Sequence, residues 1–375
     1  MTTPSIPSPA TWSSGPVTTK ALRADVSNGV SYLSGRPLFI GYNIGGGIIP
    51  ANGVISVPLD TEAVDNWGGH SPAVDNTVYL CQSPGWYWTV SVIVLAYTTT
   101  TAALFASEIA TTFAGAGSSL IGDQRAGGNG FQPSLLAFDL CPLATTGSDY
   151  VRAVARNPSS AAVGLFATSP NLSYLSARWV AALSGTTGLP VPSNPAWPVP
   201  PGYVTSSFLN GNIRDTLRFL TYPPLFRGYL ATSSGPSLPS AAPLTPTVVT
   251  LDTTTGSGSG GPATDNYSGW HSGSNSWQAP VAGVYTIGGQ AGVSAGGGTF
   301  AVGFSVNGTV TWVKSIGDPI ISGQPACIAG IRRVRLNAGD TVQLVASQSS
   351  GATVNLIGSG TGGSFCKMVI FWESA

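Results

Sequence analysis

The sequence predicts an all-β protein made of two tandem antiparallel jelly-roll sandwiches, each preceded by a short amphipathic helix and a Pro-rich segment. The first observation is composition: 49 Gly and 29 Pro in 375 residues favour many turns, while 42% hydrophobic residues exceed what a disordered chain carries. The second is pattern, because short β-forming runs such as VYTIGGQAGV and VRLNAGDTVQLVAS are separated by turn residues. The third is an internal repeat.

The repeat is clearest in VTTKALRADVSNGVSYLSGRPLF at 17–39 and VTSSFLNGNIRDTLRFLTYPPLF at 204–226, which are related by an offset of 187 residues. Both segments predict a helix, because apolar residues recur at spacings of 4, 4 and 3. Thr19 and Ser206 suit the helix starts, and Gly35 and Pro223 suit the ends. Such short helices are marginal alone, so the stripe needs a partner surface. We expect these stripe residues to form an oligomer interface: Leu22, Val26, Val30, Leu33, Leu209, Ile213, Leu217 and Leu220.

The repeat and the composition also predict the order of segments along the chain. A Pro/Ser-rich arm comes first, and a second Pro-rich stretch links the two halves. The expected segments are the arm at 1–16, a helix at 17–39, a jelly roll at 40–183, a linker at 184–203, a helix at 204–226 and a jelly roll at 227–375.

Shared marks in the β regions resemble the jelly roll of the tumour necrosis factor and complement globular-head family. This resemblance covers roughly 55–182 and 248–375, and it implies modules that trimerise about an axis. The first copy departs from the pattern, because Ser148 stands where the second copy has Gly339. The marks are Gly283, Tyr285, Leu336, Gly339, Asp340, Val342 and Phe371 in the second copy, and Gly85, Tyr87, Asp149, Val151 and Trp179 in the first.

The leader of each copy, at Trp12 to Phe39 and Trp197 to Phe226, is similar to minor tail proteins of tailed phages that infect actinobacteria (mycobacteriophage-like). The resemblance implies a non-enzymatic virion protein of the tail tip or fibre, made in the host cytoplasm. It also implies a homotrimer. From the position of the arm at 1–16 we expect it to join the protein to other virion proteins, with host cell-wall glycan as a second candidate partner. The alternatives are a capsid head fibre or decoration protein and a carbohydrate-binding module for the host cell wall.

Net charge and hydropathy limit the classes of partner that the protein is expected to bind. Lys plus Arg and Asp plus Glu number 15 each, and charged residues make up 8% of the chain, which argues against electrostatic capture of nucleic acid or an anionic membrane. The most apolar stretch, around Trp86 to Tyr97, is too short to span a bilayer, and the first residues lack the pattern of a secretory signal. We expect no nucleic-acid partner and no membrane insertion.

The two histidines, His70 and His271, fall at matching places in the two copies. The chain lacks HxH, HExxH and CxxC spacings, so a structural turn is favoured over catalysis or a transition metal. We expect no catalytic residue and no enzyme activity.

Oxygen-bearing side chains gather after the first helix, and calcium binds through such oxygens. The second copy keeps few of them, which favours turns capped by side chains over a shared metal site. We expect neither metal nor cofactor. The candidate calcium residues are Asp60, Glu62, Asp65, Asn66, Asp75 and Asn76, against Asp252, Asp265 and Asn266 in the second copy.

Strict alternation sends Trp86 and Trp88 to one face of a strand and Tyr87 to the other. We expect the two indoles in a core or at a subunit interface, with sugar stacking as the weaker alternative. The cysteines, expected as buried and reduced thiols, are Cys81, Cys141, Cys327 and Cys366.

Overall fold

The computed structural model describes residues 19–96, 103–113, 116–127, 134–167, 172–185, 187, 206–232, 235–241, 244–254, 256–258, 261–294, 298–317, 326–360 and 363–375. The expected arm at 1–16 and most of the expected linker at 184–203 lie outside these residues. In the described part, no helix is both long enough and apolar enough to span a membrane.

The first half forms an antiparallel sandwich. One sheet has the order β1-β12-β6-β9 and the other β5-β10-β7-β8, with β4 beside β1, β3 beside β10, and β11 and β2 beyond β6. The strands are β1 (Leu38–Asn43), β2 (Gly47–Ile49), β3 (Gly53–Ser56), β4 (Thr61–Asp65), β5 (Tyr79–Leu80), β6 (Gly85–Ala96), β7 (Ala103–Phe113), β8 (Ala116–Gly127), β9 (Ser134–Leu143), β10 (Tyr150–Asn157), β11 (Val163–Leu165) and β12 (Ser173–Ala181).

The second half repeats this plan, with β13-β28-β20-β23 in one sheet and β19-β24-β21-β22 in the other. The main strands are β13 (Leu225–Tyr229), β19 (Ser276–Gln278), β20 (Gly283–Val293), β21 (Thr299–Val306), β22 (Thr309–Gly317), β23 (Ala326–Leu336), β24 (Thr341–Gln348) and β28 (Lys367–Ser374). The accessory strands are β14 (Ser237–Leu238), β15 (Thr247–Val248), β16 (Gly256–Gly258), β17 (Gly261–Asp265), β18 (Trp270–His271), β25 (Val354–Asn355), β26 (Ser359–Gly360) and β27 (Gly363–Ser364).

The strand order identifies the fold. Numbering the eight main strands of each half in chain order gives one sheet 1-8-3-6 and a second sheet 2-7-4-5 in both halves. Two four-stranded antiparallel sheets connected in this way form a jelly roll. The predicted fold class, two tandem jelly rolls, is therefore confirmed.

The same set of contacts occurs in both halves and explains why each half contains the sequence Gly-x-Tyr. The hydroxyl groups of Tyr87 and Tyr285 donate to the carbonyls of Ser83 and Val281, each 2.8 Å away. Gly85 and Gly283 lie so close to the indoles of Trp179 and Trp372 that a Cβ atom would stand 2.0 and 2.1 Å from the ring nitrogen. Trp372, rather than the expected Phe371, therefore occupies the place of Trp179.

Helices precede both sandwiches, as predicted, but each is shorter than the expected segment. The first is α1 (Thr19–Ser34), and the second runs through α2 (Ser206–Leu209), a π-helical turn η1 (Asn210–Arg214) and α3 (Asp215–Thr221). The last residues of the segments 17–39 and 204–226 already belong to β1 and β13, because Pro37 and Pro224 cannot continue a helix. The carbonyls of the two prolines instead accept hydrogen bonds from β12 and β28, the strands that pair with β1 and β13.

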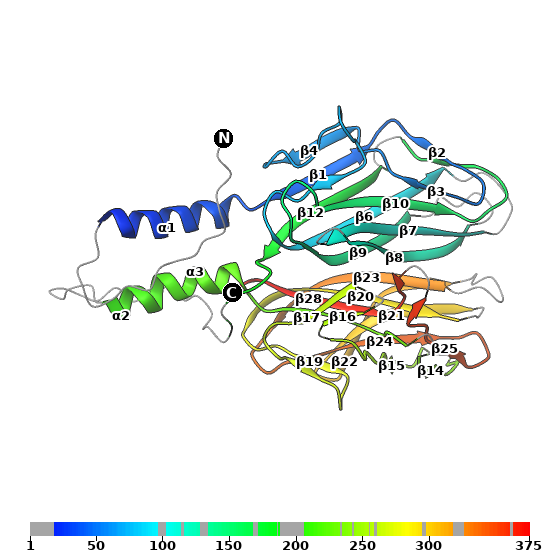
Figure 1. Cartoon of the computed structure of the whole chain (residues 1–375). Helices are drawn as coiled ribbons and strands as arrows, with labels where there is room; N and C mark the ends of the chain where they lie inside the picture. The colour runs from blue at the N-terminus through cyan, green and yellow to red at the C-terminus, as the bar shows by residue number, and fades with distance from the viewer. Residues whose placement is uncertain are drawn as a thin grey trace.

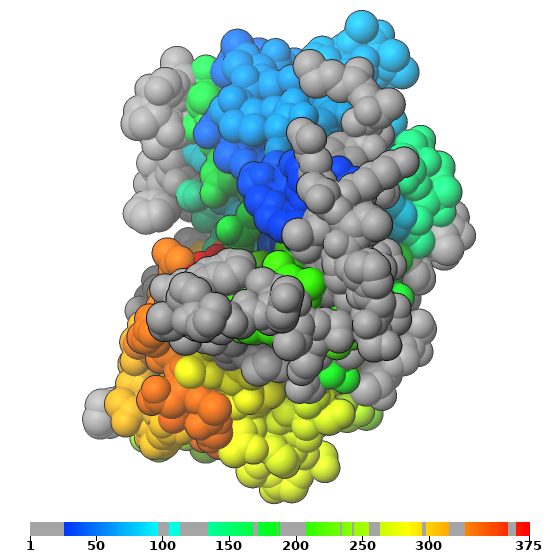
Figure 2. Space-filling view, turned by 90° about the vertical axis from the view of Figure 1, so that its left-hand side faces the viewer, coloured from blue at the N-terminus to red at the C-terminus, as the bar shows by residue number. Residues whose placement is uncertain are grey.

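The two helices lie side by side and project from the same end of the two sandwiches (Figure 1). They touch where Gly29 of α1 meets Leu217 of α3: a Cβ atom on Gly29 would stand 3.0 Å from a Leu217 methyl group. Figure 2 shows the first sandwich stacked on the second. Each sandwich has its own buried core, centred on residues such as Tyr87 in the first and Tyr285 in the second.

Candidate functional site

The junction between the two sandwiches is the most elaborate feature of the described structure. The sheet that holds β6, β9 and β12 meets the sheet that holds β13, β20, β23 and β28, and a third buried cluster fills the space between them. Trp88 lies 5.5 Å from Phe138 and 5.2 Å from Phe371, measured between ring centroids. The cluster consists of Trp86, Trp88, Phe138, Leu140, Val180, Ala181, Leu225, Ala329, Val369 and Phe371.

The two tryptophans are therefore interface residues, and the interface lies within one chain. Trp86 is 6% exposed and Trp88 8% exposed, which leaves neither indole face open for stacking on a sugar. Of the two expected locations, a core or a subunit interface, the buried core is confirmed for Trp86 and Trp88.

A buried ion cluster joins the sandwiches. The carboxylate of Asp139 on β9 accepts bonds from Arg227 Nε at 2.6 Å and Arg227 Nη2 at 3.1 Å, and from Lys367 Nζ at 2.9 Å. None of the three side chains is more than 2% exposed. Burial would raise the pKa of Asp139, but the two cations and their hydrogen bonds outweigh burial and hold that pKa below its ordinary value.

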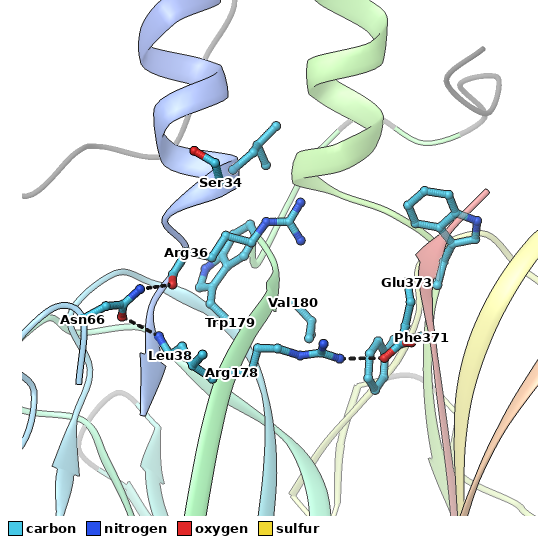
Figure 3. Close-up of a pocket in the computed structure, with 11 residues that line it drawn as sticks. Ser34, Arg36, Leu38, Asn66, Arg178, Trp179, Val180, Phe371 and Glu373 are labelled. Atoms are coloured by element: carbon cyan, nitrogen blue, oxygen red, sulfur yellow. Dashed lines mark hydrogen bonds and ion pairs between the residues drawn. The ribbon is translucent and has the colours of Figure 1, made fainter. Parts of the chain in front are cut away.

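A groove of about 360 Å³ opens beside this junction, under the helices (Figure 3). Its polar side chains come from both halves: Arg36 follows α1, Arg178 is on β12 and Glu373 is on β28. Arg178 Nη2 donates to Glu373 Oε1 at 2.8 Å, and this ion pair bridges the sandwiches. The groove is thus lined by charged groups that the pairing of the two copies brings together.

His70 has a structural role in a turn. Its ring is buried, and Nδ1 lies 2.7 Å from Glu62 Oε1. The turn is held by Asp65, whose carboxylate accepts bonds from the backbone N–H groups of Gly68, Gly69 and His70.

The expected equivalence of His70 and His271 is wrong. In the second copy Asp265 binds the N–H of Trp270 as Asp65 binds that of His70, so Trp270 takes the place of His70. Both rings pack against the same phenylalanine of the repeat, with ring centroids 5.1 Å apart for His70 and Phe39 and 5.2 Å apart for Trp270 and Phe226. His271 is one residue further on and exposed.

The candidate calcium residues are dispersed over several turns. Asp60 accepts bonds from Asn43, Gly45 and Asn76, and Asp75 accepts bonds from Thr77. Asn66 and Asn266 both accept a bond from the first residue of their sandwich, Leu38 or Leu225. Asp252 accepts bonds from the N–H groups of Ala231 and Thr232. In the described residues, no three His, Cys, Asp or Glu side chains gather as metal ligands do.

The predicted oligomer-interface residues divide into two sets. Leu209 and Leu217 are buried, and Leu217 contacts the other helix of the same chain. Val26, Leu33, Ile213 and Leu220 are half-buried, and Val30 is 53% exposed. Leu22 lies in α1, but the surroundings of its side chain are outside the described structure.

All four cysteines are buried, and none of them forms a disulfide in the described structure. Burial raises the pKa of Cys141 and of Cys366 to about 12, which keeps both thiols protonated and weakly reactive. No residue of the described structure presents an activated nucleophile in the groove.

The junction is what sequence reasoning missed. The sequence pattern identified Trp86 and Trp88. Asp139 is separated by 88 residues from Arg227 and by 228 residues from Lys367, so these three residues form no local sequence pattern. The one available signal is the rarity of charge in this chain, because a lysine or arginine inside an apolar strand such as LFRGYL must find a buried partner.

No protein-family model and no curated protein sequence matches the chain. Among similar solved structures, the globular domain of zebrafish complement 1qA protein is 14% identical, with 40% of this chain and 98% of that chain covered and a TM-score of 0.28. Murine APRIL is 12% identical, with 38% and 98% covered and a TM-score of 0.29. Eiger TNF from S. frugiperda is 12% identical, with 40% and 95% covered and a TM-score of 0.30.

Proposed function

We propose that this tandem jelly-roll protein is a non-enzymatic structural protein of a phage virion, a minor tail protein of the tail tip or fibre, that forms a homotrimer and contacts the host. The jelly-roll fold and the repeated leader support this role. The observation that carries it is the helix pair, which projects from one end of the sandwiches and keeps an apolar residue in solvent.

The helices are the surface that suits self-association. The sheets that carry the apolar cluster face each other within the chain, so that face is already occupied. Val30 is 53% exposed on α1, and a pair of short helices gains stability from further packing. Three such pairs around an axis would bury Val30 together with the half-buried Val26 and Ile213.

Light scattering coupled to gel filtration tests this assembly. We expect a mass of three chains of 38.1 kDa, and we expect Val30→Asp to reduce it to one chain because burying an unpaired charge is costly. Val74→Asp is the matched control, since Val74 is 87% exposed and lies between β4 and β5 of the first sandwich, outside both helices. A monodisperse wild-type monomer at micromolar concentration would contradict the trimer.

Labelling the protein on intact particles, with imaging by cryo-electron microscopy, tests the location. We expect the label at the tail tip or along a tail fibre. Label on the capsid would instead support a head fibre or decoration protein, and absence from purified particles would overturn the virion role altogether.

A further inference from the structure

The groove at the junction contains more positive than negative charge. Glu373 is its one acidic lining residue among those described, and both of its oxygens are in use. Oε1 accepts bonds from Arg178 at 2.8 Å and Thr286 at 2.9 Å, and Oε2 from Arg333 Nε at 2.6 Å. The carboxylate of Glu373 is thus already paired with two guanidinium groups, those of Arg178 and Arg333, and Arg36 adds further positive charge to the groove.

Arg36 has no carboxylate partner in the described chain. Its Nη2 donates to the carbonyl of Leu220 at 3.1 Å, and its guanidinium carbon lies 5.3 Å from the centroid of the Trp179 ring. Its Nε is buried and makes no hydrogen bond to any described residue. Burial lowers the pKa of Arg36 to about 10, so the group stays charged at neutral pH.

Figure 3 shows Arg36 and Arg178 extending from the first sandwich toward the second, one above the other, with Val180 between them. A half-buried guanidinium that lines a groove without a carboxylate partner is a binding group for a planar anion, since its fork matches the two oxygens of a carboxylate. The nearby carboxylate of Glu373 disfavours a doubly charged phosphate. The volume of about 360 Å³ is in the lower part of the range of small-molecule sites.

We propose that this groove binds a carboxylate-bearing ligand of about monosaccharide size, held between Arg36 and Arg178. Two sources share this chemistry, an acidic sugar and the carboxyl end of a peptide. The site is contained within one chain, so it is independent of trimerisation and of the virion role.

Ligand-observed NMR titration of the full-length protein tests the site, with D-glucuronate and N-acetyl-alanyl-alanine as probes. D-glucose and the C-terminal amide of the peptide are their neutral controls. We expect saturable binding of at least one acid at concentrations up to the order of 10 mM, and none of its control. Binding of glucuronate alone identifies an acidic-sugar site, and binding of the peptide alone identifies a peptide-end site.

Variants then locate the binding. Arg36→Gln should weaken it at least about tenfold, because a charge-assisted bond is lost. Arg335→Gln, which removes an exposed charge outside the groove, should leave it unchanged. Ser34→Trp provides a second test that keeps every buried contact, since Ser34 is exposed at the rim and the larger ring blocks entry. Absence of saturable binding by both acids, or full binding by both groove variants, would overturn the proposal.

Discussion

Gly288 determines how closely the two sandwiches approach each other. A Cβ atom at this position would stand 2.4 Å from Phe138 Cε2 and 2.8 Å from Val369 Cγ2. Phe138 is fully buried and comes from the other sandwich, so it cannot move aside. Phe138 therefore occupies the space that a side chain at position 288 of β20 would need.

We predict that Gly288→Ala lowers the free energy of unfolding by about 1–3 kcal/mol, the usual cost of overpacking a dense interior. Urea unfolding followed by tryptophan fluorescence measures this loss. Gly164→Ala is the matched strand control, because its new Cβ would make an ordinary contact of 3.5 Å with Ala96 Cβ. Equal stability of the two variants would show that the sandwiches can separate without cost.

Asp139 neutralises two buried cations, so its removal should be more damaging than the loss of a surface carboxylate. We predict that Asp139→Asn costs about 3–5 kcal/mol, because Arg227 and Lys367 keep their charge and lose their shared partner. Asp252→Asn, in an exposed turn, should cost about 1 kcal/mol. The urea midpoints of the two variants at neutral pH provide the comparison.

Asp139 should also make the free energy of unfolding depend on pH in the acidic range. Since the folded protein lowers the pKa of Asp139, its contribution is complete above the ordinary carboxyl value of 3.8 and is lost as pH falls through the lower folded-state pKa. The gap in urea midpoint between wild type and Asp139→Asn should therefore narrow as the pH falls below the ordinary carboxyl value of 3.8. A gap that stays constant over this range would mean that Asp139 does not titrate with folding.

At the scale of elements, strand order explains the state of the cysteines in the second sandwich. Cys327 on β23 and Cys366, directly before β28, lie on opposite sides of β20, where Gly292 pairs with Cys327 and its N–H donates to the Cys366 thiol. Strands two places apart are separated by about 9–10 Å, and a disulfide requires Cα atoms about 4.4–6.8 Å apart. Non-reducing peptide mapping should recover both as free thiols, and a Cys327–Cys366 crosslink would contradict this strand order.

Sequence reasoning succeeded where the information is local and repeated. The helices, the Gly-x-Tyr pair and the turn-punctuated strands recur in both halves, and the Gly-x-Tyr pair reflects contacts within one sandwich. It failed at His271, because the HS dipeptide of the second copy lies one residue further from its aspartate than that of the first, and it hides the true partner of His70, which is Trp270.

The junction could not be predicted because it breaks the repeat. The pairing registers place Ile40 and Tyr174 of the first copy where the second has Arg227 and Lys367. The two copies have therefore diverged where they meet, and similarity between them carries no sign of that contact. Only the folded chain brings the carboxylate of Asp139 to the two cations.

At the scale of the whole molecule, the sandwiches should depend on each other. A fragment of residues 1–185 would expose Trp86, Trp88 and Phe138 and leave Asp139 without its cations. We predict that this fragment aggregates alone and copurifies in soluble form with 186–375 when the two are coexpressed. A soluble, monodisperse 1–185 fragment with the thermal midpoint of the full chain would show that the junction adds little to stability.

The direction of the helices gives the molecule a polarity. Because α1 ends at Ser34 and leads into β1 at Leu38, its first residue, Thr19, is at the end far from the sandwiches (Figure 1). The arm at 1–16 precedes that end, so we propose that it joins the protein to the particle. Strands β2 and β3 lie at the opposite end of the molecule, and Ile48 of β2 is 70% exposed there.

Deleting residues 1–16 should therefore release the protein from particles while the trimer mass and the thermal midpoint stay unchanged, since neither the described helices nor the strands lose a residue. Ile48→Asp should leave incorporation intact and reduce adsorption to host cells, because an exposed apolar residue at the outer end is suited to contact another surface. Quantitative mass spectrometry of purified particles and an adsorption assay measure the two effects. Full incorporation of the arm deletion, together with loss of Ile48→Asp from particles, would mean that the sandwich end, rather than the helix end, attaches to the virion.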